Sequence, residues 1–291
     1  MNLNGTITPL ESHDDLAKEI GLSRLYFKRE DLHPLGSHKG RSISYMIDYY
    51  VKQGDKNFVI SSSGNAALAA AKYVIGLNDD ITLDIFVGNK INQDKLSKLK
   101  ELENDKIRIL IKERPLQAIA VAVEEGRRSL RQSTDDIALI GYKSLSDEIM
   151  QVNDVGAVFI ATSSATTAQA LAQNFIKNKR NIQVHIVQTS SCHPISEFFD
   201  LYSGKEEISE ADAIVDITAH RKDPVTKLIN DTGGFGWIAN NDDIHTAMNM
   251  TMNITGIQIS PNSALSVVGA MKASYEGYEI NGSVICIISG K

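Results

Sequence analysis

Short apolar runs alternate with longer segments of helical periodicity along most of the chain. Apolar runs that do not alternate with polar residues are typical of strands buried on both faces. The predicted strands are Leu25–Lys28, Phe58–Ser61, Leu83–Val87, Ile107–Ile111, Val155–Ala161, Val184–Gln188 and Val284–Ile288. The predicted helices are Gly40–Gln53, Ala66–Ile75, Gln93–Glu103, Pro115–Arg131, Ser144–Gln151, Thr167–Lys177 and Ala264–Tyr275. This alternation predicts an α/β fold with mainly parallel sheets that helices cover on both faces.

Two turn-rich stretches, Asp31–Lys39 and Gln132–Asp136, indicate domain boundaries. We expect residues 43–140 to form a smaller, mobile domain, and residues 1–42 and 141–291 to form a larger one. Each is expected to be an open three-layer αβα domain. Ligands of such folds bind beyond the carboxyl ends of the strands, often in a cleft between domains, so we expect the site there.

The composition of the chain and its net charge exclude several classes of function. The 291 residues carry a formal net charge of −6, which gives no electrostatic footprint for nucleic acid. Two cysteines exclude a disulfide scaffold and a zinc site ligated by cysteines, and the seven histidines show no metal-binding spacing, so no metal is expected. Met1–Thr8 lacks the features of a signal peptide, and no apolar run is long enough to cross a membrane. We therefore expect a cytoplasmic protein without membrane contact.

The first chemically unusual strand end is the segment that leads to Lys39. Pro34 and Gly36 break the chain there, and Ser37 is expected to cap the next helix, which places Lys39 in its first turn. A lysine in such a place is either a solvated surface residue or a buried amine that forms a Schiff base with a carbonyl cofactor. A helix N-terminus and neighbouring cations lower the pKa of an amine and make it a better nucleophile.

Two further strand ends are rich in small hydroxyl residues. Ser61–Ala67 and Ala161–Thr167 each follow a predicted strand and open a helix. Backbone N–H groups at such a helix start can bind a carboxylate or a phosphate. The simpler interpretation is an ordinary capped helix, with Ser63 or Asn65 as the cap of the first one. Two such loops and a strand-end lysine in one chain favour an anion-binding site.

A collinear set of motifs resembles the fold-type II pyridoxal-phosphate enzymes, which include threonine synthase, threonine dehydratase, cysteine synthase and the tryptophan synthase β subunit. The matching segments are Thr8-Pro9-Leu10, Tyr26–Leu32, Gly36-Ser37-His38-Lys39, Ser62–Asn65, Gly141–Leu145, Val187-Gln188 with Pro194-Ile195, and Ser289-Gly290. The segment up to Lys39 is most similar to tryptophan synthase β. Gly141–Leu145 and Val187-Gln188 with Pro194-Ile195 are most similar to threonine synthase.

The resemblance implies a role for each matching residue. Lys39 would bind the cofactor, pyridoxal 5'-phosphate, as a Schiff base and later move the substrate's α-proton. Ser62, Ser63 and Asn65 would bind the substrate carboxylate, with Asn65 also against the cofactor's 3-hydroxyl. The other implied cofactor contacts are His38 near the phosphate, Thr162, Ser163, Ser164, Ala165 and Thr166 around it, and Ser289 at the ring nitrogen. A neutral hydroxyl at that nitrogen suits elimination and replacement at Cβ more than transamination.

The chain departs from its relatives at two positions. Its phosphate loop has Ser and Thr where most relatives have glycine, and Ser260 stands where many relatives carry a glutamate before the proline. The leading hypothesis is a lyase or synthase, closest in motif to threonine synthase, that acts on a small amino acid by β- or γ-elimination or replacement. The alternatives are a serine/threonine dehydratase, a cysteine synthase-type enzyme, a catalytically silent relative that binds the cofactor, and, ranked last, a nucleotide-binding protein. The expected assembly is a homodimer.

For two other segments we expect a structural role and not a catalytic one. Gly233–Trp237 is expected to be a mobile turn near the site, because no convincing strand precedes it. His220–Pro224 is basic and could meet a substrate phosphate, but we expect a solvated loop.

Overall fold

The computed structural model describes residues 5–77, 80–202, 204 and 208–290. Its contacts divide the chain into two compact units. The first unit contains His33–Gly141 and the described residues before Ile7, and the second contains Ile7–Leu32 and Tyr142–Lys291. Residues 33–42 therefore belong with the first unit, whereas the sequence analysis places them in the larger domain. The functional division into a cofactor-binding and a mobile domain stays a prediction.

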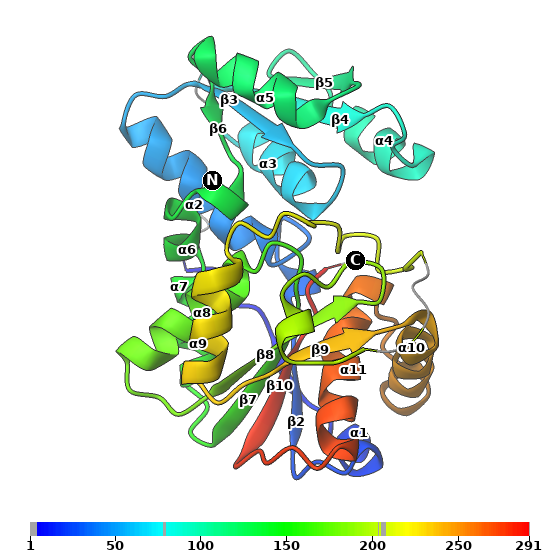
Figure 1. The fold of residues 1–291 in the computed structure, drawn as a ribbon. Helices are drawn as coiled ribbons and strands as arrows, with labels where there is room; N and C mark the ends of the chain where they lie inside the picture. Colours follow the sequence, from blue (N-terminus) through cyan, green and yellow to red (C-terminus); the bar gives the residue numbers. More distant parts are fainter. Residues whose placement is uncertain (1–4, 78–79, 203, 205–207, 291) are drawn as a thin grey trace. The chain divides into compact units, whose positions relative to one another are not determined.

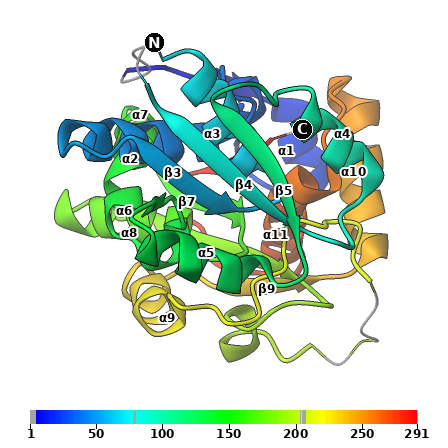
Figure 2. The same cartoon turned by 90° about the horizontal axis from the view of Figure 1, so that it is seen from above.

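The first unit is built on a parallel sheet with the strand order β5-β4-β3-β6. Its strands are β3 (Asn57–Ser61), β4 (Thr82–Gly88), β5 (Ile107–Lys112) and β6 (Arg128–Ser129). Its helices are α2 (Lys39–Lys52), α3 (Asn65–Ile75), α4 (Gln93–Lys100), α5 (Pro115–Glu124) and α6 (Ile137–Gly141), with a 3-10 turn at Gln132–Thr134. Figure 2 shows β3, β4 and β5 side by side.

Side chains of this sheet point alternately to two apolar layers, as successive strand residues must. Phe58 and Ile60 pack in the cluster formed with α2, α3 and α4. Val59, between them, packs with Ile119 and Ala122 of α5 on the opposite face. Burial on both faces explains why these strands read as continuous apolar runs.

The second unit is built on a sheet with the strand order β1-β2-β10-β7-β8-β9, parallel except for the antiparallel pair β1–β2. Its strands are β1 (Leu10–Ser12), β2 (Leu25–Lys28), β7 (Val155–Ala161), β8 (Gln183–Thr189), β9 (Gly236–Ala239) and β10 (Ser283–Ile287). Its helices are α1 (Asp14–Ile20), α7 (Lys143–Met150), α8 (Thr166–Lys177), α9 (Lys222–Asp231), α10 (Asn241–Thr255) and α11 (Pro261–Tyr275), with 3-10 turns at Glu30–Leu32 and Ser196–Phe198.

Helices cover both faces of this second sheet (Figure 1). α1, α10 and α11 pack on one face, where Phe27, Phe159, Trp237 and Cys286 belong to the apolar core. α7, α8 and α9 lie on the other face. Each unit is thus a three-layer αβα arrangement, and the predicted α/β fold class with mainly parallel sheets is confirmed.

Two local expectations are wrong. The predicted helix Pro115–Arg131 ends at Glu124, because Gly126 takes a left-handed φ of +90° and the chain then enters β6. Gly233–Trp237 is not a mobile turn, since Gly236–Ala239 forms the buried edge strand β9, paired with β8. A Cβ atom at Gly234 would lie 2.0 Å from the Val184 carbonyl oxygen, so glycine allows the close approach that a larger residue would block.

Within the described ranges, no helix is both long and apolar enough to span a lipid bilayer.

Candidate active site

Lys39 is the first residue of α2 and is half-buried. The preceding turn folds back on the helix start: the Gly36 amide donates to the His33 carbonyl (2.6 Å), and the Leu35 amide donates to His33 Nδ1 (3.1 Å). A Cβ atom at Gly40 would lie 2.5 Å from the His33 ring, so the turn can pack against α2 only because Gly40 has no side chain. This packing fixes the backbone position of Lys39.

Ser37 does not cap α2, contrary to the expectation from the sequence. The cap position is His38, a residue that is 7% exposed. The Ser37 hydroxyl is buried and has no hydrogen-bond partner among the residues that the structure describes. A buried hydroxyl without a partner is uncommon in proteins, so this one is a donor available to a bound ligand two residues from Lys39.

The loop after β3 carries Ser62, Ser63 and Asn65, all half-buried. Gly64 takes the cap position of α3 in an extended conformation, and its amide donates to the Ser62 hydroxyl (3.2 Å). Neither Ser63 nor Asn65 occupies the cap position, and Gly64, which does, has no side chain to make a capping bond. The first amides of α3 are thus left to bind a carboxylate, as an uncapped helix N-terminus can.

The loop after β7 also opens a helix whose cap residue makes no side-chain capping bond. Ala165 takes the cap position of α8 with a left-handed φ of +60°, an uncommon conformation for a residue with a side chain. The Ala165 side chain makes no capping hydrogen bond to the start of α8. The start of this helix can therefore donate several amides to one anion.

The hydroxyl groups of this loop differ in what they already bind. The Thr162 hydroxyl donates to the Ile160 carbonyl (3.1 Å), and its amide donates to the Val187 carbonyl (2.9 Å), so both donors of Thr162 have acceptors. The Ser163 hydroxyl accepts from the amides of Val215 and Asp216 (3.2 Å each) and keeps its own proton. Ser164 and Thr166 place their hydroxyl oxygens 3.1 Å apart. Both side chains lie at the helix start, where an anion would bind.

Ser289 lies just beyond the carboxyl end of β10 and is 4% exposed. Its hydroxyl is 3.4 Å from that of Ser263, on the first turn of α11. β10 and β7 are adjacent and parallel, with Cys286 opposite Phe159. Because both strands run in the same direction, Ser289 and the Thr162–Thr166 loop emerge from the same edge of the sheet. The second unit thus has the predicted phosphate-binding loop and the predicted partner of the ring nitrogen at one edge of its sheet.

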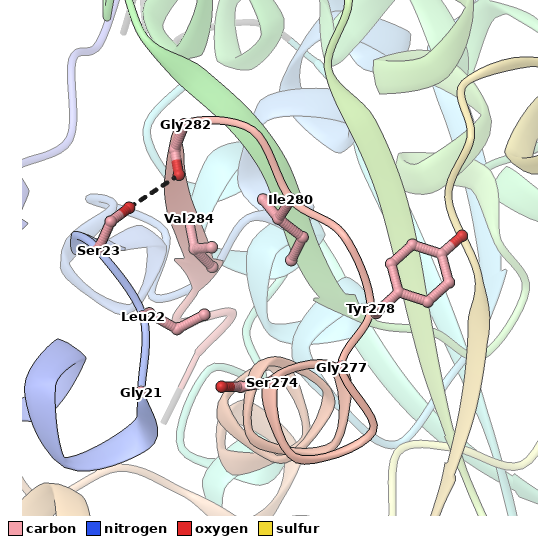
Figure 3. A pocket seen from close by; sticks show the side chains of 9 residues that line it. All are labelled: Gly21, Leu22, Ser23, Ser274, Gly277, Tyr278, Ile280, Gly282 and Val284. Atoms are coloured by element: carbon pink, nitrogen blue, oxygen red, sulfur yellow. Dashed lines mark hydrogen bonds between the residues drawn. The ribbon is translucent and has the colours of Figure 1, made fainter.

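A small cavity of about 250 Å³ lies elsewhere in the second unit (Figure 3). It is lined by residues near the amino ends of β2 and β10 and at the end of α11, including Ser23, Ser274 and Val284. The Ser23 hydroxyl donates to the Gly282 carbonyl at 3.3 Å. This cavity lies at the sheet edge opposite Ser289, and it contains none of the predicted site residues.

The basic segment beside α9 differs from the solvated loop that the sequence analysis expects. His220 is exposed, but Arg221 is 5% exposed and donates from Nη1 to Gln169 Oε1 (3.0 Å). Gln169 belongs to the first turns of α8. Arg221 therefore supports the helix that opens with the hydroxyl-rich loop.

Sequence reasoning did not include Ser263 among the candidate residues. Ser263 is fully buried and hydrogen-bonds to Gly290 and Ser289. A signal was available in the sequence, since Ser260 and Ser263 flank Pro261 at a helix start, but Ser289, the partner of Ser263, lies 26 residues further along the chain. Only the pairing of α11 with the end of β10 reveals the contact.

Several known proteins are similar to this chain in sequence or in fold. A family model described as "Pyridoxal-phosphate dependent enzyme" matches residues 1–290. Threonine synthase from Mycobacterium tuberculosis is 22% identical over 97% of this chain and 80% of the mycobacterial enzyme. Human L-serine dehydratase/L-threonine deaminase is 42% identical, but over only 22% of this chain and 19% of the human protein. The structure of threonine deaminase isoform 2 from Solanum lycopersicum superposes with a TM-score of 0.81 at 21% identity and covers 98% of this chain and 84% of the tomato chain.

The structural likeness agrees with the parallel αβα architecture, and the family match spans almost every residue of the sequence. Lys39, the two loops at uncapped helix starts and Ser289 all fall within the matched residues. The chain belongs to the family of pyridoxal-phosphate-dependent enzymes, and its cofactor is pyridoxal 5'-phosphate.

Proposed function

We propose that the chain catalyses β- or γ-elimination or replacement on a small amino acid, with threonine synthase-like chemistry as the leading candidate. Two observations support this choice. The relatives that match 97% of the chain include threonine synthases from bacteria and archaea. The motifs at Gly141–Leu145 and Val187-Gln188 are also most similar to that enzyme.

The residues present fit pyridoxal phosphate chemically. An aldehyde needs a primary amine, which Lys39 provides at the start of α2. A phosphate needs several converging donors, which the uncapped start of α8 and the hydroxyls of Ser164 and Thr166 offer. A pyridine nitrogen that stays neutral needs a hydrogen-bond donor without a negative charge, and the Ser289 hydroxyl is such a group. His38, Ser163 and Ala165 are proposed as further contacts of the phosphate, and Thr162 as a backbone support of the loop.

The observation that carries the proposal is the surroundings of Ser289. Its hydroxyl is next to Ser263, and Ser263 in turn bonds Gly290 and Ser260. These contacts between Ser289, Ser263, Ser260 and Gly290 are made by neutral hydroxyls and backbone groups. A ring nitrogen held by a hydroxyl remains largely unprotonated, which moderates electron withdrawal and favours loss of a leaving group at Cβ or Cγ over transamination.

The chain's own residues have separate roles in substrate binding and proton transfer. The amides at the start of α3, with Ser62, Ser63 and Asn65, would hold the substrate carboxylate and fix the orientation of the α-hydrogen. Bound pyridoxal phosphate supplies an electron sink for the electrons released from Cα. Lys39 Nζ would take the α-proton as a general base and return a proton later.

A serine/threonine dehydratase is the second candidate. The segment that is 42% identical to the human L-serine dehydratase/L-threonine deaminase favours it, although that match covers only 64 residues. The two candidates differ in their products. A dehydratase releases ammonia and a 2-oxo acid from serine or threonine, whereas a synthase releases a leaving group from Cγ, adds water at Cβ and forms threonine.

The test is reconstitution of the purified chain with pyridoxal phosphate, followed by assays of both reactions. The substrates are L-serine, L-threonine and a homoserine that carries a phosphate on its side-chain oxygen. Release of phosphate together with threonine supports the synthase, and formation of 2-oxo acid supports the dehydratase. Cofactor binding without turnover of any of the three would contradict both candidate reactions and support a catalytically silent relative. A cytoplasmic location and a homodimer stay predictions.

A further inference from the structure

A buried group of hydroxyls joins the start of α11 to the end of β10. Ser260 Oγ and Ser263 Oγ each lie 2.8 Å from the Gly290 carbonyl oxygen as donors. Ser263 Oγ also accepts from the Gly290 amide at 3.3 Å and lies 3.4 Å from Ser289 Oγ. Ser263 is 0% exposed and Ser289 is 4% exposed, so water does not compete for these bonds.

The number of hydroxyl protons limits which hydrogen bonds Ser263 and Ser289 can make with each other. Each serine hydroxyl has one proton to donate and can accept two hydrogen bonds. If Ser289 donates its proton to a ring nitrogen, its contact with Ser263 must be a bond in which Ser263 donates. Ser263 can turn its proton from Gly290 to Ser289 without loss, because Ser260 continues to satisfy the Gly290 carbonyl. The Ser263 hydroxyl can therefore donate to Ser289 when Ser289 donates its own proton to a ligand.

We propose that Ser263 is a positioning residue for Ser289: it holds the Ser289 oxygen in place and directs the Ser289 proton toward the cofactor's ring nitrogen. This inference rests on the proposed function, which assigns Ser289 to that nitrogen, and extends it to a side chain that would not touch the cofactor. Ser260 has a supporting role, since its hydroxyl keeps Gly290 bonded and also accepts from the Ser263 amide (3.3 Å).

The test is a double-mutant cycle on the full chain. The variants are Ser263→Ala, Ser289→Ala and the double variant, each prepared without cofactor and titrated with pyridoxal phosphate while the visible absorption band is recorded over a range of pH. Ser266→Ala is the matched control, because Ser266 is a fully buried serine on the same helix that donates to the Ser263 carbonyl (2.8 Å) and not to Ser289. Thermal unfolding of each cofactor-free variant reports on folding, and Ser263→Gly replaces Ser263→Ala if the alanine variant does not fold.

If Ser263 acts through Ser289, Ser263→Ala weakens cofactor binding by about five- to tenfold in the wild-type background and by less than about twofold in the Ser289→Ala background. It should also shift the pH midpoint of the band in the same direction as Ser289→Ala. Ser266→Ala should leave both readouts within about twofold of wild type.

Equal effects of Ser263→Ala in the two backgrounds, or an unchanged pH midpoint in a variant that folds, would overturn the positioning role while leaving the cofactor assignment intact. A wild-type chain that binds no pyridoxal phosphate would instead overturn the proposed function, and this inference with it.

Discussion

The hydroxyl oxygens of Ser263 and Ser289 lie 3.4 Å apart in the second unit, although 26 residues separate them in the sequence. One belongs to the first turn of α11 and the other follows β10. The contact ties the final residues of the chain to a buried helix start through neutral groups. A charge introduced at Ser289 tests whether the neutrality of this contact matters for the chemistry.

Ser289→Asp should redirect the chemistry. A carboxylate beside the ring nitrogen would protonate it and make the cofactor a stronger electron sink. We expect the rate of elimination or replacement to fall by about tenfold or more, with a rise in conversion of the cofactor to its amine form. The two products are measured in the same reaction. Ser289→Thr keeps a hydroxyl and should retain the wild-type ratio, so a similar change of ratio in both variants would contradict the role of charge.

The phosphate loop should depend on two of its hydroxyls. Ser164 and Thr166 lie together at the start of α8, and a charge-assisted hydrogen bond to phosphate contributes on the order of 1.5–3 kcal/mol. The double change of Ser164 and Thr166 to Ala should therefore weaken pyridoxal phosphate binding by about tenfold or more, measured by equilibrium titration of the cofactor-free chain.

Thr162→Val is the control for that experiment. The Thr162 hydroxyl already donates to Ile160, so its loss should change cofactor affinity by no more than about twofold. If the Ser164 and Thr166 changes have as little effect as Thr162→Val, the backbone alone holds the phosphate and the hydroxyls are not needed.

The loop after β3 should recognise the substrate carboxylate. Ser63→Ala and Asn65→Ala remove side-chain donors but keep the amides at the start of α3. We expect each to raise the amino-acid concentration that half-saturates the substrate-induced spectral change by about fivefold, with cofactor affinity altered less for Ser63→Ala than for Asn65→Ala. An unchanged substrate titration in both variants would rule out this assignment.

His185 should make stability sensitive to acid. Burial lowers the pKa of His185 from the ordinary 6.5 to about 3, and the ring stacks on Phe159 and accepts from Trp237 Nε1 (3.2 Å). Between those pKa values the unfolded chain binds a proton that the folded chain does not, so the free energy of unfolding falls as pH falls from about 6.5 toward 3. At pH 5 the loss is about 2 kcal/mol relative to pH 8.

Chemical denaturation at both pH values measures this loss. His185→Gln should reduce the pH dependence, because an amide accepts the Trp237 N–H without gaining a proton. Equal pH dependence in wild type and His185→Gln would contradict a neutral buried His185.

Elements with strong apolar periodicity could be predicted from the sequence. Val155–Ala161 has the predicted bounds, and Val184–Gln188 is one residue short of β8 at each end, because strands buried on both faces read as continuous apolar runs. β9 could not be predicted, since glycines lie at and before its start, and only packing explains two of them: Gly234 approaches Val184, and Gly236 approaches Phe199 and Ser196. α10 was missed because Asn and Thr residues with low helix propensity dilute its apolar pattern, although its capping box at Asn240 and Asp243 was a usable signal.

The site could be predicted only as far as local motifs reach. Lys39 and the Thr162–Thr166 loop are recognisable because each follows a strand and opens a helix. The partners of these residues are set by packing between distant segments: Val215 and Asp216 bond Ser163, and Ser263 meets Ser289. Such contacts depend on the order of strands in the sheet, which local propensity does not encode.

The central claim is that Lys39 binds pyridoxal phosphate covalently, and borohydride reduction tests it most directly. The reconstituted chain is reduced, digested and mapped, with Lys39→Ala treated in parallel. We expect one labelled peptide, which contains Lys39, and loss of the visible band at about 410–420 nm in Lys39→Ala. A label on another lysine, with covalent cofactor retained in a folded Lys39→Ala variant, would contradict it.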